Sequence, residues 1–231
     1  MEVVRAIGFD LDHTLAIDNR LERVAFLRLL ERISALGGRS AGTLADEIDA
    51  IDGLLERQRR GDFGIDEAVR IFARDRGVAC DDALIEEFRR TALAMVEEFV
   101  VPLPGVGRTL ERLRQRGIEL AVLSNGWDPL QQRKAERAGF AGPVLVSSEI
   151  GALKPALPAF QRLLETLGRP ARESWYVGDD PHSDVGGAHR AGMTTVWLNW
   201  ERRGYPTSEA PPQYAIASFD ELLELVEEAA A

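Results

Sequence analysis

The 231-residue chain contains one cysteine, two lysines and no long apolar run. The single cysteine, Cys80, cannot form an internal disulfide, which fits a reducing compartment. No uncharged stretch approaches the roughly 18 residues that a membrane span needs. Charged residues close to the N-terminus also interrupt the apolar segment that a signal peptide would require. These absences predict a cytoplasmic protein with no membrane partner.

Positive charge is scarce as well. Asp and Glu outnumber Lys and Arg by 38 to 28, and the formal net charge is -10 at pH 7. Nucleic acids and anionic membranes bind basic surfaces, so neither is expected as a partner. Only Lys134 and Lys154 are lysines, and every other basic residue is arginine. A site for an anionic substrate must therefore supply its positive charge locally.

Short β-branched and aromatic runs alternate with amphipathic patterns along most of the chain. The runs predict buried strands at 3–9, 119–124, 143–147, 174–178 and 194–199. The amphipathic patterns predict helices at about 106–116, 129–138, 156–167 and 184–191, and a last helix from Ser218. Strands that alternate with helices are typical of an α/β fold with a parallel sheet.

Residues 17–101 interrupt this alternation. They contain no run typical of a strand, and helical periodicity recurs at about 19–36, 43–60, 66–76 and 81–99. We therefore predict two domains: an α/β core formed by residues 1–16 and 102–231, and an all-helical domain, residues 17–101, inserted after the first strand.

Polar residues follow the predicted strands at four places. They are Asp10, Asp12 and Thr14 after the first strand, Ser124 and Asn125 after the second, Lys154 after the third, and Asp179, Asp180 and Asp184 after the fourth. Ligands of open parallel sheets bind beyond the carboxyl ends of the strands, so one crevice should collect these groups.

Crowded carboxylates repel one another, and a divalent cation between them removes that conflict. Oxygen ligands of this kind favour Mg²⁺. The cation, Lys154 and the main-chain N–H groups after Ser124 would form a positive pocket in an acidic protein. Two aspartates with different neighbours, such as Asp10 and Asp12, can act as nucleophile and as proton donor. This combination is typical of an enzyme that forms an aspartyl-phosphate.

Four motifs, in this order, resemble those of the haloacid-dehalogenase-like (HAD) hydrolase superfamily. They are FDLDHTL (9–15), LSNG (123–126), Lys154–Pro155 and VGDDPHSD (177–184). The helical insert after the first motif resembles the helical cap of that family. The resemblance implies a Rossmann-like parallel sheet and phosphatase-like chemistry.

The resemblance also implies roles for the residues of the first motif and for the metal site. Asp10 would be the nucleophile, and Asp12 would protonate the leaving alcohol and then activate water. Thr14 would fix the geometry of the loop. Asp10, the main-chain carbonyl of Asp12, and Asp179 would bind Mg²⁺.

The remaining motif residues would bind the phosphoryl group or support those that do. Ser124, Asn125 and Lys154 would contact phosphoryl oxygens. Asp184 would hold metal-bound water or orient Lys154. For Asp180 two interpretations remain open: the same supporting role, or a helix cap.

Phosphomonoester hydrolysis on a small phosphorylated metabolite is the activity that we predict. Asp12 argues against dehalogenation, because a halide leaves without a proton, and the lysine-free segment 17–101 argues against phosphonatase chemistry. A sugar-phosphate mutase remains an alternative, as does a non-catalytic module that responds to phosphate or binds a partner. Neither the exact substrate nor the oligomeric state follows from the sequence.

Overall fold

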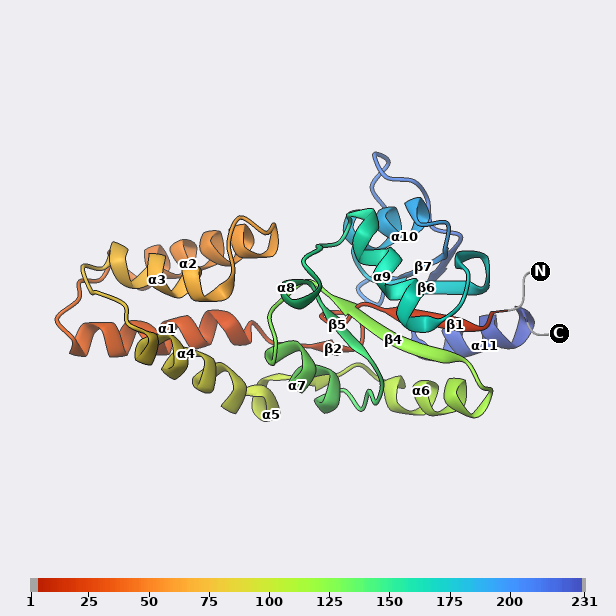
Figure 1. Cartoon of the computed structure of the whole chain (residues 1–231), viewed down its shortest axis with the longest axis horizontal. Coiled ribbons are helices and arrows are strands. Elements are labelled where there is room, and N and C mark those ends of the chain that lie inside the picture. The colour runs from red at the N-terminus through yellow and green to blue at the C-terminus, as the bar shows by residue number, and fades with distance from the viewer. Residues whose placement is uncertain (1–3, 230–231) are drawn as a thin grey trace. The chain divides into compact units, whose positions relative to one another are not determined.

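The computed structural model describes residues 4–229 and divides into two compact units (Figure 1). The core unit contains the described residues up to Ile17 and those from Val101 onward, and the helical unit is Asp18–Val100. No helix among the described residues is long and apolar enough to cross a lipid bilayer.

A six-stranded, wholly parallel sheet forms the centre of the core unit, in the order β5-β4-β1-β6-β7-β8. Its strands are β1 (Ala6–Phe9), β4 (Glu119–Ser124), β5 (Val144–Val146), β6 (Ser174–Gly178), β7 (Thr194–Leu198) and β8 (Tyr214–Ile216). Five of them fall on the predicted runs, which confirms the predicted α/β fold. The edge strand β8 was not predicted.

Helices cover both faces of this sheet (Figure 1). Gly8 of β1 faces α9 (Leu157–Leu167) so closely that a Cβ atom there would lie 2.5 Å from Leu163 Cδ2. On the opposite face, Phe9 stacks on Phe219 of α11 (Phe219–Ala229), with 6.4 Å between ring centroids. Successive residues of a strand point to opposite faces, which explains why a short apolar run contacts both helical layers.

The helices of the core unit are α6 (Val106–Gln115), α7 (Leu130–Arg137), α8 (Ser147–Ile150), α9 (Leu157–Leu167), α10 (Gly187–Arg190) and α11 (Phe219–Ala229). Where the sequence predicted a single helix at 184–191, the structure has a π-helix at Pro181–Gly186 followed directly by α10. A two-stranded antiparallel pair, β2 (Ala16–Ile17) and β3 (Val101–Pro102), lies where the chain leaves and re-enters the core unit.

The helical unit contains α1 (Leu21–Ala35), α2 (Leu44–Arg59), α3 (Ile65–Asp75), α4 (Asp82–Ala94) and α5 (Val96–Phe99). Its interior includes three aromatic rings, with the ring centroid of Phe26 5.1 Å from that of Phe72 and 4.6 Å from that of Phe88. A buried ion pair joins Arg76 to Glu47. The Arg76 guanidinium also lies 3.4 Å from the Phe72 ring centroid, a cation–π contact.

Candidate active site

The predicted polar residues come together at the carboxyl ends of neighbouring strands. Asp10 directly follows β1, and its main-chain N–H donates to the Val177 carbonyl of β6 at 2.9 Å. The buried hydroxyl of Thr14 donates to Asp10 Oδ2 at 3.3 Å. Since β1 is flanked by β4 and β6, the residues that follow these three strands share one edge of the sheet.

Lys154 forms the electrostatic centre of this edge. Its Nζ lies 2.5 Å from Asp10 Oδ1 and 2.7 Å from Asp184 Oδ1, and only 6% of the residue is exposed. Burial alone would lower the pKa of the ammonium, but the charges of Asp10 and Asp184 together raise that pKa well above its ordinary value. Lys154 is therefore a permanent cation in contact with two carboxylates.

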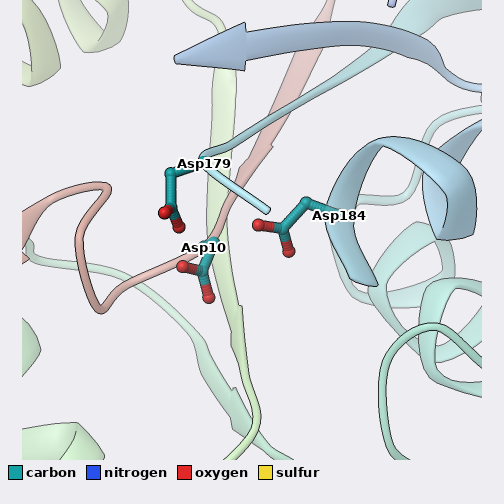
Figure 2. A group of neighbouring side chains, drawn as sticks. All are labelled: Asp10, Asp179 and Asp184. Atoms are coloured by element: carbon teal, nitrogen blue, oxygen red, sulfur yellow. The ribbon is translucent and has the colours of Figure 1, made fainter. Parts of the chain in front are cut away.

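Three carboxylates converge beside Lys154. Figure 2 shows the side chains of Asp179 and Asp184 extending toward Asp10, and one oxygen from each of the three lies within 4.8 Å of the others. Burial, together with the neighbouring carboxylates, raises the pKa of Asp10 to about 7 despite the opposing effect of Lys154. Burial and the charge of Asp10 raise the pKa of Asp179 to about 6. A cluster of oxygens that resists ionisation without additional positive charge fits a hard divalent cation.

Strand β7 and the loop after it also contact Asp179, and sequence reasoning missed both contacts. Arg203 Nη2 lies 3.0 Å from Asp179 Oδ2, and the Trp197 indole N–H donates to the Asp179 carbonyl at 2.9 Å. The guanidinium partly offsets the rise in the pKa of Asp179. Asp179 is thus held at both its main chain and its side chain.

Asp12 has a different environment from Asp10. Lys134 Nζ lies 3.0 Å from Asp12 Oδ1, and Gln131 Nε2 donates to Asp12 Oδ2 at 2.8 Å. The same Gln131 nitrogen donates to Ser124 Oγ at 2.6 Å. Sequence reasoning missed Gln131 and Lys134. A signal for Lys134 was present, because it is one of only two lysines in the chain.

The Asn125 side chain holds the main chain of Lys154. Asn125 Nδ2 donates to the Lys154 carbonyl at 2.9 Å, and the Lys154 N–H donates to Asn125 Oδ1 at 2.8 Å. Both ends of the amide are therefore used to place the loop that carries Lys154. The contact of Asn125 with phosphoryl oxygens stays a prediction.

Asp180 and Asp184 play clearly different structural parts. The Asp180 carboxylate accepts from the main-chain N–H groups of His182 (3.0 Å) and Ser183 (2.6 Å), so it caps the π-helix, as the second interpretation of this residue predicted. The Asp180 N–H donates to Asp184 Oδ2 at 3.0 Å, and Asp184 Oδ1 pairs with Lys154. Asp184 thus links the fourth motif to the lysine of the third.

The chain matches a known protein family over most of its length. Residues 4–192 match the family model described as haloacid dehalogenase-like hydrolase. The chain is 35% identical over 133 residues to the pyrimidine 5'-nucleotidase YjjG of Escherichia coli, covering 56% of this chain and 58% of that protein. It is 36% identical over 141 residues to the glyceraldehyde 3-phosphate phosphatase of Methanopyrus kandleri, covering 57% and 59%. In both alignments the chain spans about three fifths of the relative's length.

A longer alignment and several solved structures extend the similarity over the whole chain. The glyceraldehyde 3-phosphate phosphatase of Pyrococcus furiosus is 27% identical and covers 98% of this chain and 95% of its own. The HAD phosphatase of Thermococcus onnurineus has a TM-score of 0.72 at 23% identity, covering 96% and 98%. The HAD-hydrolase YfnB of Bacillus subtilis, solved bound to magnesium, has a TM-score of 0.71 at 22% identity, covering 97% and 99%. These structures share the fold.

Proposed function

Because this chain belongs to the haloacid dehalogenase-like hydrolase family, we propose that it is a Mg²⁺-dependent phosphatase that hydrolyses a small phosphomonoester through an aspartyl-phosphate. One observation carries the proposal. Lys154 and the carboxylates of Asp179 and Asp184 surround Asp10, while Asp12 lies in a separate environment with partners of its own. The arrangement supports different roles for the two aspartates.

Asp10 would attack the phosphorus atom through a carboxylate oxygen. As that O–P bond forms, the P–O bond to the leaving group breaks, and its electron pair stays on the leaving oxygen. The Lys154 ammonium lies 2.5 Å from Asp10 Oδ1, so phosphoryl oxygens that approach Asp10 would meet a positive charge already in place. The Ser124 hydroxyl accepts from Gln131, which leaves its hydrogen for another phosphoryl oxygen.

Asp12 would transfer the protons of both half-reactions. In the first it protonates the leaving oxygen, so that an alcohol departs. In the second it accepts a proton from water as the water oxygen bonds to phosphorus and the bond between phosphorus and Asp10 breaks. Inorganic phosphate and the Asp10 carboxylate result, and Asp12 regains its proton.

The carboxylate cluster fits Mg²⁺ by its ligand chemistry. Asp10 and Asp179, with the main-chain carbonyl of Asp12, would hold the cation, and Asp184 would support Lys154 while adding negative charge beside them. Bound Mg²⁺ would supply charge that neutralises the phosphoryl oxygens.

The substrate class is proposed from the relatives. One is a pyrimidine 5'-nucleotidase and two are glyceraldehyde 3-phosphate phosphatases, and their names refer to phosphate esters of small metabolites. The groups collected at the sheet edge address only the phosphoryl end of such a molecule. We therefore propose a small phosphomonoester without choosing between nucleotides and sugar or triose phosphates.

Phosphate release from a panel of such esters, with Mg²⁺ and with EDTA, tests the proposal. We expect release with Mg²⁺ alone, and a loss in Asp10→Asn of at least about a thousandfold. Asp220→Asn is the matched control, because its side chain is exposed and pairs with Arg108 on the surface. No release by folded wild-type protein would overturn the hydrolase. Near-normal turnover by Asp10→Asn would overturn the nucleophile.

A further inference from the structure

We propose that Gln131 and Lys134 of α7 are positioning residues that hold the Asp12 carboxyl group in the orientation needed for proton transfer. The inference rests on the proposed function, which gives Asp12 its proton-transfer role. Gln131 and Lys134 lie three positions apart, so their side chains leave the same face of the helix.

Each residue of the pair binds a different oxygen of Asp12. The Lys134 ammonium contacts Oδ1 at 3.0 Å, and the Gln131 amide donates to Oδ2 at 2.8 Å. Gln131 and Lys134 are 2% and 1% exposed, whereas 30% of the Asp12 side chain is exposed. A carboxyl group that faces solvent would rotate among several orientations. Two donors on a buried helix face restrict it to one, which is what efficient proton transfer requires.

The choice of lysine at position 134 supports a specific role. The chain uses arginine for 26 of its 28 basic residues, and its only two lysines are both buried beside aspartates of the first motif. Lys154 contacts Asp10, and Lys134 contacts Asp12. Burying an ammonium is costly unless a partner compensates for the lost hydration. A helix needed only for packing would bear an apolar residue at this position.

The buried placement of Gln131 is unfavourable for one of its own atoms. Its Oε1 is buried without a hydrogen-bond partner in the structure, and a buried acceptor of this kind loses its hydration without compensation. Room for the side chain depends on Gly126, because a Cβ atom there would lie 2.7 Å from Gln131 Cδ. The Nε2 group bridges Asp12 Oδ2 and Ser124 Oγ. The side chain therefore couples the orientation of Asp12 to the hydroxyl proposed to bind the phosphoryl group.

Leaving-group dependence separates this role from a purely structural one. An alkyl phosphate needs a proton on its leaving oxygen, whereas 2,4-dinitrophenyl phosphate releases a stable anion. In Lys134→Met and in Gln131→Met, we expect kcat/KM for an alkyl phosphate to fall by about tenfold or more, and for the dinitrophenyl ester by less than about threefold. The double variant should lose less than the product of the single losses, because both residues hold one carboxyl group.

Arg133→Met is the matched control. It removes one positive charge from the same helix, but Arg133 is exposed and pairs with Glu136 on the surface. It should change kcat/KM for either ester by less than about twofold. Equal losses on both esters, or no loss in either variant, would overturn the inference. If Lys134→Met does not fold, Gln131→Met decides alone.

If the protein is not a phosphatase, the wild type hydrolyses neither ester, which distinguishes this case from a wrong role for Gln131 and Lys134. Crystal structures of the wild type and of Lys134→Met then show whether these two residues hold Asp12. We expect the Asp12 carboxyl group to change orientation or lose order in the variant. An unchanged, well-ordered carboxyl group would overturn the positioning role, independently of any activity.

Discussion

Replacing Lys154 with methionine should destabilise the core unit strongly at neutral pH, and much less at acid pH, when no Mg²⁺ is present. The ammonium forms ion pairs of 2.5 and 2.7 Å with two buried carboxylates. Methionine has a similar size, so the main effect is the loss of charge. Removing one partner of a buried ion pair typically costs about 3–5 kcal/mol, and we expect a loss of that size at about pH 7.5.

Protonation of the carboxyl groups sets an upper limit on this loss. Protonating one carboxyl costs about 1.4 kcal/mol for each pH unit above the ordinary aspartate pKa of about 3.9. The limit is therefore about 5 kcal/mol per carboxyl group at pH 7.5, and about 1.5 kcal/mol at pH 5.0. Lys154 lowers the pKa of Asp10, so its removal raises that pKa further above the unfolded value. A carboxyl group whose pKa is higher in the folded than in the unfolded state stabilises the fold at low pH. This stabilisation is lost as the pH rises through the folded pKa. The loss in the variant must therefore grow with pH.

Urea unfolding in EDTA at both pH values, followed by tryptophan fluorescence, measures this effect. All four tryptophans, Trp127, Trp175, Trp197 and Trp200, lie in the core unit, so the helical unit does not contribute to the signal. Arg162→Met is the control, because Arg162 is 62% exposed and pairs with Glu165. Arg162→Met should lower the free energy of unfolding by less than about 0.5 kcal/mol at either pH. Equal losses for Lys154→Met at the two pH values, or wild-type stability at pH 7.5, would refute the reasoning.

Two further predictions concern the metal site and the helical unit. Mg²⁺ should raise the melting temperature more at about pH 8 than at about pH 5.5, because it competes with protons on Asp10 (pKa about 7) and Asp179 (pKa about 6). Asp179→Asn should remove most of this rise, and equal rises at both pH values would contradict the prediction. In the helical unit, Glu47→Gln should lower the free energy of unfolding by about 3 kcal/mol, because the buried Arg76 loses its charged partner. Hydrogen exchange of α2 and α3 measures this against the exposed control Glu56→Gln, and unchanged protection would contradict it.

The sequence predicted the sheet well because burial on both faces leaves a simple pattern. The runs that became β1, β4 and β6 are nearly all apolar, and parallel pairing then placed the residues after them at one edge. The edge strand β8 is only three residues long, Tyr214–Ile216, and one of them is exposed, so it lacks that pattern.

Contacts that depend on tertiary placement were harder to predict. The α7 sequence LQQRKAER is polar around most of its circumference, and nothing local shows that Gln131 and Lys134 face inward while Arg133 faces solvent. The Arg203 contact with Asp179 depends on how a long loop after β7 returns to the sheet edge. The Asn125 side chain was predicted to lie at the right edge, but its use in holding Lys154 depends on the approach of a second loop.

The burial of both lysines also determines how the protein responds to chemical modification. Reagents that acylate amines need a free, accessible nitrogen, and the side chains of Lys134 and Lys154 are enclosed and paired with carboxylates. Neither lysine should be modified in the native state unless the core unit opens locally or globally. The extent of lysine acylation over time would therefore report how often this part of the protein opens. Coupling to a solid support through lysine side chains should be correspondingly inefficient.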